Sequence, residues 1–229
     1  MELSLVEFEV CWEFLALGDL PPFLTTPLAE QTFQQRKEKV NSALATLRGR
    51  GLADNDGLAP DLTNLLLGLG RFEWAVNAWL TGEHPVRARG ASTGVLGILD
   101  GDRVLLRRVP VEDLLCELVA LAQQTPANVV SLRHTEVKAL RQQLIRSGLS
   151  EQNARVMSEL VDNADWRGQF TVSVCTPDGV YSPLDSIGFH ATPHGQVMHS
   201  RSATRTTILP ATPDAMVNAL SRLRDELAA

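Results

Sequence analysis

Hydrophobic and polar residues alternate most clearly in the stretch 71–109, which carries the strongest strand signals of the chain. Apolar residues fall on every second position from Phe72 to Ala78, and again at Val104 and Leu106. A period of two is typical of strands that bury one face. Gly101, between two aspartates, provides the positive φ that a tight hairpin turn needs. The pattern predicts an antiparallel meander.

A second set of short strands is predicted near the C-terminus, where turn-forming residues separate alternating segments. These segments are 166–175, 186–191, 196–200 and 205–209. No stretch of helix length separates the strands within either set, so the strands of each set are expected to pair antiparallel.

Helical periodicity dominates the segments around the two strand sets. Apolar residues spaced by three and four positions predict helices over 7–17, 28–50, 61–69, 111–123, 136–146 and 150–163. Thr212 and Pro213 match the N-cap and first position of a last helix.

The layout of helices and strands occurs twice along the chain. Two helices joined by a Gly-Leu step precede each strand set, at Gly51-Leu52 and at Gly148-Leu149. The strand pair 92–109 resembles the strand pair 186–203, and a leucine-rich helix follows each set. Chance agreement of common patterns is the alternative, but the joint agreement in order favours a duplication. We therefore expect a single domain, 1–229, with half-repeats at approximately 28–123 and 133–228.

The predicted fold class is α+β: a central antiparallel β-sheet with pseudo-twofold related halves, flanked by two helical bundles. A chain of 229 residues with 44% hydrophobic residues can fill such a core.

Net charge argues against nucleic acid as the main partner, because the chain carries −6 at pH 7 with a pI near 5.4. The one basic cluster is interpreted as a solvated sheet face balanced by nearby acids. Its members are Arg87, Arg89, Arg103, Arg107 and Arg108, and the acids are Asp100, Asp102, Glu112 and Asp113.

Cysteine usage and hydropathy indicate a cytoplasmic protein. Cys11, Cys116 and Cys175 are widely spaced and lie within apolar patterns, which fits reduced thiols. The first residues do not resemble a signal peptide. No apolar run approaches the length of about 20 residues that spans a bilayer, so no membrane insertion is expected.

Motifs of catalysis or cofactor binding are not found in the sequence, and we expect no catalytic residues, no cofactor and no metal. His190, His194 and His199 are the one group that resembles metal ligands. Their spacing suits zinc poorly, so they are interpreted as surface histidines of a hairpin. Glu7 and Glu13, with Glu9 between them, are interpreted as the solvated face of a helix.

Three segments together resemble the EspG family of type VII secretion-associated proteins from actinobacteria. They are the opening ELSLVEFEVCWEFLALGDLPPFL, the phrase LRGRGLADNDGLAPDLTNLLLGLGRFEWAVNAWL and the ending GQVMHSRSATRTTILPATPDAMVNALSRLRDEL. The resemblance covers almost the whole chain and implies the fold described above. It also implies a non-enzymatic function: a cytosolic chaperone that binds PE–PPE heterodimers at the apolar tip of the PPE helical hairpin and keeps them soluble for secretion.

The family pattern builds the partner surface from the sheet, the loop between the first two meander strands and the C-terminal helical bundle. Its residues here would be Glu83, His84 and Pro85 of the loop, with Arg87 and Arg89 of the next strand. The chain is short for the family, with a trimmed loop.

Three large apolar residues of the C-terminal half are added to this set as candidate interface anchors: Trp166, Phe170 and Val172. Ordinary core positions are the equal alternative for these residues.

Two other functions remain open from the sequence. A duplicated sheet with a free edge can pair with a second copy, which would make the chain a homodimeric scaffold. A small-molecule or metal enzyme would need a convergent polar site, and the sequence predicts none.

Overall fold

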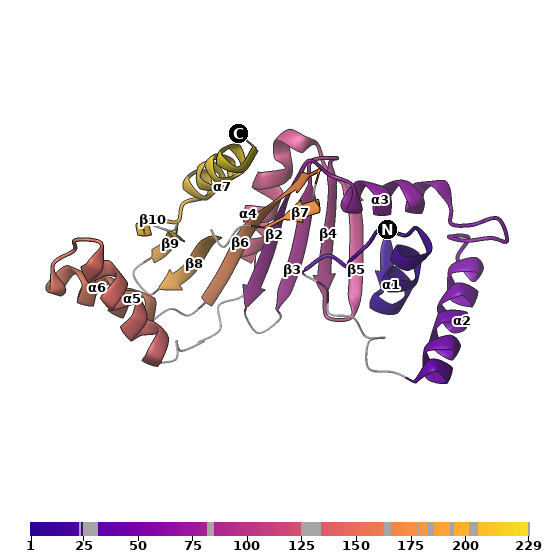
Figure 1. The fold of residues 1–229 in the computed structure, drawn as a ribbon, viewed down its shortest axis with the longest axis horizontal. Helices are drawn as coiled ribbons and strands as arrows, with labels where there is room; N and C mark the ends of the chain where they lie inside the picture. The colour runs from indigo at the N-terminus through magenta and orange to yellow at the C-terminus, as the bar shows by residue number, and fades with distance from the viewer. Residues whose placement is uncertain are drawn as a thin grey trace.

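A computed structural model describes residues 1–22, 24, 32–81, 85–124, 134–162, 166–177, 179–182, 186–192, 195–201 and 206–228. Its centre is one antiparallel sheet of ten strands (Figure 1). The strands are β1 Glu2–Ser4, β2 Trp74–Thr81, β3 Val86–Ala91, β4 Val95–Asp100, β5 Arg103–Arg108, β6 Trp166–Thr176, β7 Gly179–Tyr181, β8 Ser186–Thr192, β9 Gly195–Arg201 and β10 Thr206–Pro210. Their spatial order is β1-β5-β4-β3-β2-β6-β8-β9-β10, and β7 pairs with the end of β6.

Seven α-helices and one 3₁₀ turn of the described chain surround the sheet. The helices are α1 Leu5–Phe14, α2 Phe33–Gly49, α3 Pro60–Gly70, α4 Leu114–Gln124, α5 His134–Arg146, α6 Glu151–Asp162 and α7 Pro213–Ala228, and the 3₁₀ turn η1 is Val111–Asp113. The first helix begins two residues before its predicted start, because Ser4 and Glu7 form a capping box. The predicted cap of the last helix is confirmed, since Thr212 accepts a bond from the Ala215 N–H at 3.2 Å.

Two successive runs of elements have the same order, two helices, four strands and one helix. They are α2-α3-β2-β3-β4-β5-α4 and α5-α6-β6-β8-β9-β10-α7, with β7 inserted in the second. The first strands of the two runs, β2 and β6, pair with each other at the middle of the sheet. We call this junction the seam. The predicted α+β class with two related halves is confirmed.

The predicted Gly-Leu turns end α2 and α5 in the same way. Each is a Schellman motif: a glycine with positive φ allows the N–H of the following residue to donate a hydrogen bond to a carbonyl in the last turn of the helix. The glycines are Gly51 at φ 69° and Gly148 at φ 93°. The bonds run from Leu52 N to Leu47 O at 2.9 Å and from Leu149 N to Leu144 O at 3.1 Å.

One part of the predicted repeat is wrong by one strand. The sequence pattern matched the pair 92–109 with the pair 186–203, but those segments form β4-β5 and β8-β9. The sheet order makes β9-β10 the equivalent of β4-β5. Both halves contain successive hairpins of similar length, so alternation and turn glycines alone do not identify which hairpin corresponds to which.

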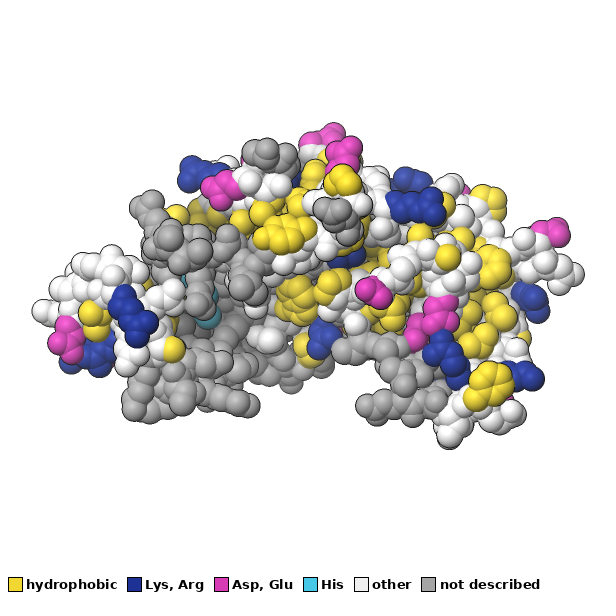
Figure 2. Space-filling view, viewed as in Figure 1, with side chains coloured by type: hydrophobic (Ala, Val, Ile, Leu, Met, Phe, Trp, Pro, Cys, Tyr) yellow, Lys and Arg dark blue, Asp and Glu magenta, His cyan; other side chains and the backbone are white. Residues whose placement is uncertain are grey.

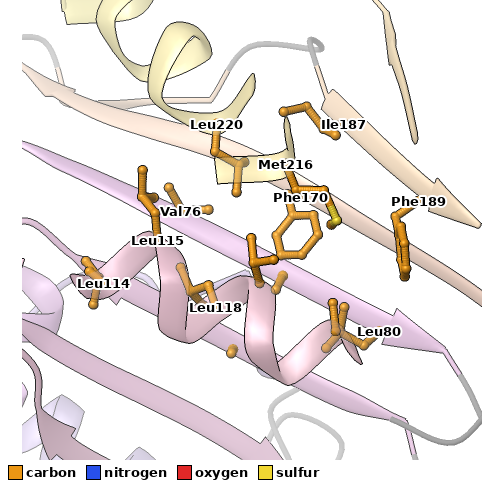
Figure 3. Close-up of a cluster of buried hydrophobic side chains, with 14 of the residues drawn as sticks. Val76, Leu80, Leu114, Leu115, Leu118, Phe170, Ile187, Phe189, Met216 and Leu220 are labelled. Atoms are coloured by element: carbon orange, nitrogen blue, oxygen red, sulfur yellow. The ribbon is translucent and has the colours of Figure 1, made fainter. Parts of the chain in front are cut away.

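Helices α4 and α7 pack together over one face of the sheet at the seam, as Figure 3 shows. The core between them joins side chains of both halves, including Val76 and Phe170 from the strands and Leu118 and Leu220 from the helices. Gly90 of β3 allows α4 to approach, because a Cβ there would lie 2.9 Å from Leu114 Cγ.

Helices α1 and α3 cover the opposite face, over the strands of the first half. Leu66 and Leu69 of α3 pack with Phe8 of α1 and with Val95 and Leu106 of the sheet. Figure 1 shows α1, α2 and α3 at one end of the sheet and α5 and α6 at the other. Helix α6 packs mainly against α5 and has a smaller contact with β8. Among the described residues, no hydrophobic cluster lies on the face of β6, β8 and β9 that is opposite α4 and α7.

Candidate functional site

The face of the central strands opposite α4 and α7 is polar where α3 no longer covers it. Because side chains alternate along a strand, every second residue belongs to this face. We call it the open sheet face. Its members include Asn77, Trp79, Arg87, Arg89, Gln169, Thr171, Ser173, Ser186, His190 and His199.

Buried residues of the open sheet face form a chain of hydrogen bonds that crosses the seam. Arg89 donates from Nε to Asn77 Oδ1 at 2.7 Å, and Asn77 Nδ2 donates to Ser173 Oγ at 3.0 Å. The hydroxyls of Ser173 and Ser182 lie 2.7 Å apart. Arg89, Asn77 and Ser173 are 4%, 1% and 0% exposed. The network therefore satisfies polar groups that would otherwise destabilise the seam.

Arg89 is a buried cation. Its guanidinium carbon lies 5.0 Å from the centre of the Phe72 ring, a cation–π contact. Burial lowers the pKa of Arg89 to about 10, because removal from water disfavours the charged form. The side chain therefore remains charged at neutral pH. Among the described residues, no carboxylate forms a salt bridge with it.

Trp79 lies at the middle of the open sheet face and was missed by the sequence analysis. It pairs across the strands with Arg87 on one side and with exposed Gln169 on the other. The indole is half-buried and belongs to none of the three hydrophobic clusters of the described chain. The alternation that predicted Trp74 and Val76 as inward-facing also implied that Trp79 faces the other way.

Two of the five candidates from the loop and the next strand, Arg87 and Arg89, belong to the open sheet face. Glu83 and His84 lie outside the described residues. Pro85 is exposed and directly precedes β3. Arg87 is half-buried and Arg89 is fully buried, although both belong to this face.

The proposed anchors of the C-terminal half do not lie on this face. Phe170 and Val172 are fully buried under α4 and α7, at 0% exposure each. The ordinary-core interpretation therefore holds for both, because the α4–α7 pair occupies the face onto which they point. Trp166 begins β6, and its side chain lies outside the described residues.

The sequence predicted that the histidines are surface residues of a hairpin, but the two that the structure describes are not exposed. His190 is 5% exposed, and its Nε2 lies 3.1 Å from Nδ1 of half-buried His199. Gly188 leaves room for this ring, since a Cβ there would lie 2.0 Å from His199 Cε1. His194 lies outside the described residues. The part of the chain that the structure describes contains no group of three potential metal ligands.

Two of the three glutamates predicted to form a solvated row are buried, whereas Glu13 is exposed and pairs with Arg36. Glu7 and Glu9 are 4% and 3% exposed, because α2 packs over α1. Glu7 accepts hydrogen bonds from the Ser4 N–H at 2.7 Å and from Arg50 at 3.1 Å. Glu7 therefore has a structural role.

Two arginines of the predicted basic cluster, both on β5, form salt bridges with glutamates. Arg103 forms a salt bridge with Glu2, and Arg107 forms one with Glu117. In Figure 2, Lys and Arg side chains of the described residues are spread over the visible face and do not gather into one continuous basic surface. Among the described residues, none of the helices has the length and apolarity that would let it cross a membrane.

Comparisons with known proteins agree with this architecture. The chain matches the model of the EspG family over residues 4–222. No curated protein matches the chain closely enough to count as a relative. Among solved structures, the chain is similar to the type VII secretion system chaperone EspG5 of Mycobacterium tuberculosis, solved in complex with a PE25–PPE41 dimer. The TM-score is 0.68 at 14% identity, over 97% of this chain and 95% of the other, which shows a shared fold. Because the family model spans nearly its full length, the chain belongs to the EspG family.

Proposed function

We propose that the chain is a chaperone of a type VII secretion system that binds PE–PPE heterodimers through the PPE subunit. Membership of the EspG family is the observation that carries this proposal. The complex of the similar chaperone EspG5 with a PE25–PPE41 dimer supports it. The function is non-enzymatic and is exerted in the cytoplasm, before the cargo reaches the secretion machinery.

The physical task of such a chaperone is to cover apolar surface. An exposed apolar helical tip drives self-association in water, and a protein that covers the tip keeps the cargo soluble. Release must remain possible, so the interface should combine a small apolar centre with a polar rim rather than resemble a protein core.

The open sheet face meets these requirements. Trp79 offers an aromatic anchor at its centre, and Trp and Arg are enriched among residues that dominate binding energy. Arg87, Gln169 and Thr171 surround the indole with hydrogen-bonding groups that remain partly in water. We assign Arg87, together with Glu83, His84 and Pro85 of the adjoining loop, to the partner surface.

Co-expression tests the proposal. The chain, carrying an affinity tag, is produced with PE–PPE pairs from the same genome, and captured material is sized by light scattering. A soluble ternary complex is expected for a cognate pair. Replacing the apolar tip residues of the PPE hairpin by serine should abolish capture while the PE–PPE pair itself remains folded.

Matched variants of the chain locate the surface. Trp79→Ala should reduce capture, whereas Arg48→Glu on the exposed side of α2, outside the open sheet face, should not. Failure of every pair to be captured, with the free chain a concentration-independent dimer, would overturn the proposal in favour of a homodimeric scaffold.

A further inference from the structure

The two outer edges of the sheet differ in how their backbone groups are satisfied. The strand order places β1 at one edge and β10 at the other. Each edge strand has a row of N–H and C=O groups that point away from the sheet and need hydrogen-bond partners.

At the β1 edge, side chains of the first half bond to the outward backbone groups. The Glu2 carbonyl accepts a hydrogen bond from Arg50, and the Ser4 N–H donates to Glu7 Oε2 at 2.7 Å. Both bonds lie on the side of β1 that does not face β5. Glu2 also places a charge on this edge, and charge discourages the approach of another strand. The chain therefore closes its first edge itself.

At the other edge, every second residue of β10 turns its backbone groups outward. The Ala211 N–H, just beyond the strand, donates to the Gln196 carbonyl of β9 at 2.9 Å. Bonded and non-bonded pairs alternate along an antiparallel ladder, so the register assigns the outward positions. They are Thr206, Ile208 and Pro210. Among the described residues, no hydrogen-bond partner is found for the outward groups of these three.

Strand β10 has the features that suit pairing with a further strand. Its sequence, TTILP, contains no charged residue that would protect the edge. Pro210 lacks its N–H on the outward side, so it leaves the ladder with β9 intact. Leu209 is 45% exposed, and a neighbouring strand would cover it. Of the described elements, β9 alone packs extensively along β10.

The first half of the sheet shows what can occupy such an edge. Strand β10 is the equivalent of β5 in the repeated order of elements, and β5 carries β1 antiparallel along its outer edge. No strand of the described chain takes the equivalent place beside β10. An antiparallel strand there would complete the correspondence between the two halves.

We infer that a second copy of this chain binds at this edge, with the two β10 strands antiparallel across a twofold axis at Ile208. Two identical strands paired in this way are self-complementary, so one edge supplies both sides of the interface. In this register Ile208 exchanges its N–H and C=O bonds with Ile208 of the second copy, and the Thr206 N–H donates to the Pro210 carbonyl. Because β10 carries no charge, the two strands meet without repulsion at the contact itself.

The symmetry of this contact determines how the dimer presents its cargo surfaces. The twofold axis is perpendicular to the continuous sheet, so the open sheet faces of both copies lie on the same side. Trp79 belongs to β2, and β6, β8 and β9 separate it from β10. The edge contact therefore leaves the proposed cargo surface unused, and the inference does not depend on the proposed function.

The contact is small, and its strength should depend on salt. One strand of five residues covers far less than the roughly 1,600 Å² of a standard protein interface, so the dimer should dissociate on dilution. Each copy carries a net charge of −6, and the copies therefore repel each other at low ionic strength. Salt screens this repulsion, so dimerisation should strengthen between about 50 and 500 mM NaCl.

Sedimentation velocity of the full chain from about 1 to 200 μM tests the inference, and a reversible monomer–dimer equilibrium is expected. Leu209→Lys puts a charge on the edge and should raise the midpoint concentration about tenfold or more. Leu105→Lys is the matched control, because Leu105 is 40% exposed but its strand is already paired on both sides. A chain that stays monomeric throughout would overturn the inference, as would a dimer that Leu209→Lys leaves unchanged.

Amide hydrogen exchange of the wild-type chain locates the contact without any substitution. At the high end of the concentration range the Ile208 amide should exchange more slowly than at the low end. The Thr207 amide faces β9 and should exchange at the same rate at both. A dimer that protects other amides and not Ile208 would assign the interface elsewhere and refute the proposed edge. Neither measurement uses cargo, so a failure to capture any PE–PPE pair would not affect them.

Discussion

The side-chain amide of Asn77 donates a hydrogen bond to Oγ of Ser173 at 3.0 Å. The two residues belong to β2 and β6, the strands at which the two halves of the sheet meet. The same amide group accepts the bond from Arg89 through its oxygen. One buried side chain therefore ties both halves and the buried cation together, and its loss should affect the whole sheet.

Asn77→Ala should lower the free energy of unfolding by about 2–4 kcal/mol, because it removes the hydrogen-bond acceptor of the buried Arg89 and the amide that donates to Ser173. Urea denaturation followed by circular dichroism measures this change. Gln169→Ala, an exposed position on the adjacent strand, is the control and should change stability by less than about 0.5 kcal/mol. Equal midpoints for the two variants would contradict the structural role of the network.

Gly188→Ala should destabilise the protein by about 1–3 kcal/mol, because the added Cβ would overlap the ring of His199. The same substitution in a His199→Ala background removes the overlapping ring. A double-mutant cycle should therefore show that Gly188→Ala costs much less unfolding free energy in the His199→Ala background than in the wild-type chain. An unchanged cost in both backgrounds would mean that the ring does not occupy this space.

Gly51→Ala and Gly148→Ala should each lower stability by about 1 kcal/mol, since both glycines have a positive φ in which alanine is strained. Nothing lies within 4 Å of a Cβ at either position, so the effect comes from the backbone alone. Gly49→Ala, in the last turn of α2, has the opposite expected sign: a gain of a few tenths of a kcal/mol. Thermal unfolding of the three variants distinguishes these outcomes.

The three cysteines should differ sharply in alkylation. Burial raises the pKa of the Cys11 thiol to about 12, with the charge of Glu7 adding to the effect. At pH 8 only about one Cys11 in ten thousand would be a thiolate, the form that reacts. Cys116 and Cys175 are exposed. Iodoacetamide at pH 8 should therefore modify two residues quickly, and mass spectrometry of peptides should find Cys11 unmodified until the protein is unfolded.

Trp79→Ala should weaken cargo binding by tenfold or more while the midpoint of urea unfolding changes little, because the indole belongs to no core cluster of the described residues. Trp79→Phe keeps an aromatic surface and should retain most of the affinity. Trp79 emission should also shift to shorter wavelength when cargo excludes water. Loss of stability equal to the loss of affinity would assign Trp79 to the core instead.

The sequence was sufficient for most elements and their order, although the short strand β7 was not predicted. Alternation from Trp74 to Ala78 and the Gly-Leu steps at Gly51 and Gly148 are local signals, and each reports a local backbone geometry that the structure confirms. Phe72, predicted to continue the alternation, precedes the strand and packs in the other hydrophobic cluster. The repeated order of helices and strands follows from the same signals.

The candidate site was less accessible to sequence reasoning, because it depends on which layer covers which face. Phe170 and Val172 share a face by alternation, but the sequence does not state that α4 and α7 occupy it. Nor does it show that α2 covers Glu7 and Glu9, or that register brings Asn77 next to Arg89. These facts arise from contacts between residues far apart in the chain.

The two halves share one layout but differ in how their helices meet the sheet. Helix α3 packs over one half of the sheet on its second face, whereas its counterpart α6 packs mainly against α5 and has a smaller contact with β8. Exposed positions of the second half, such as Gln169, can therefore be substituted without removing contacts between a helix and the sheet. In a duplicated fold, the sequence of one half can therefore be constrained by packing while the sequence of the other half is free to change.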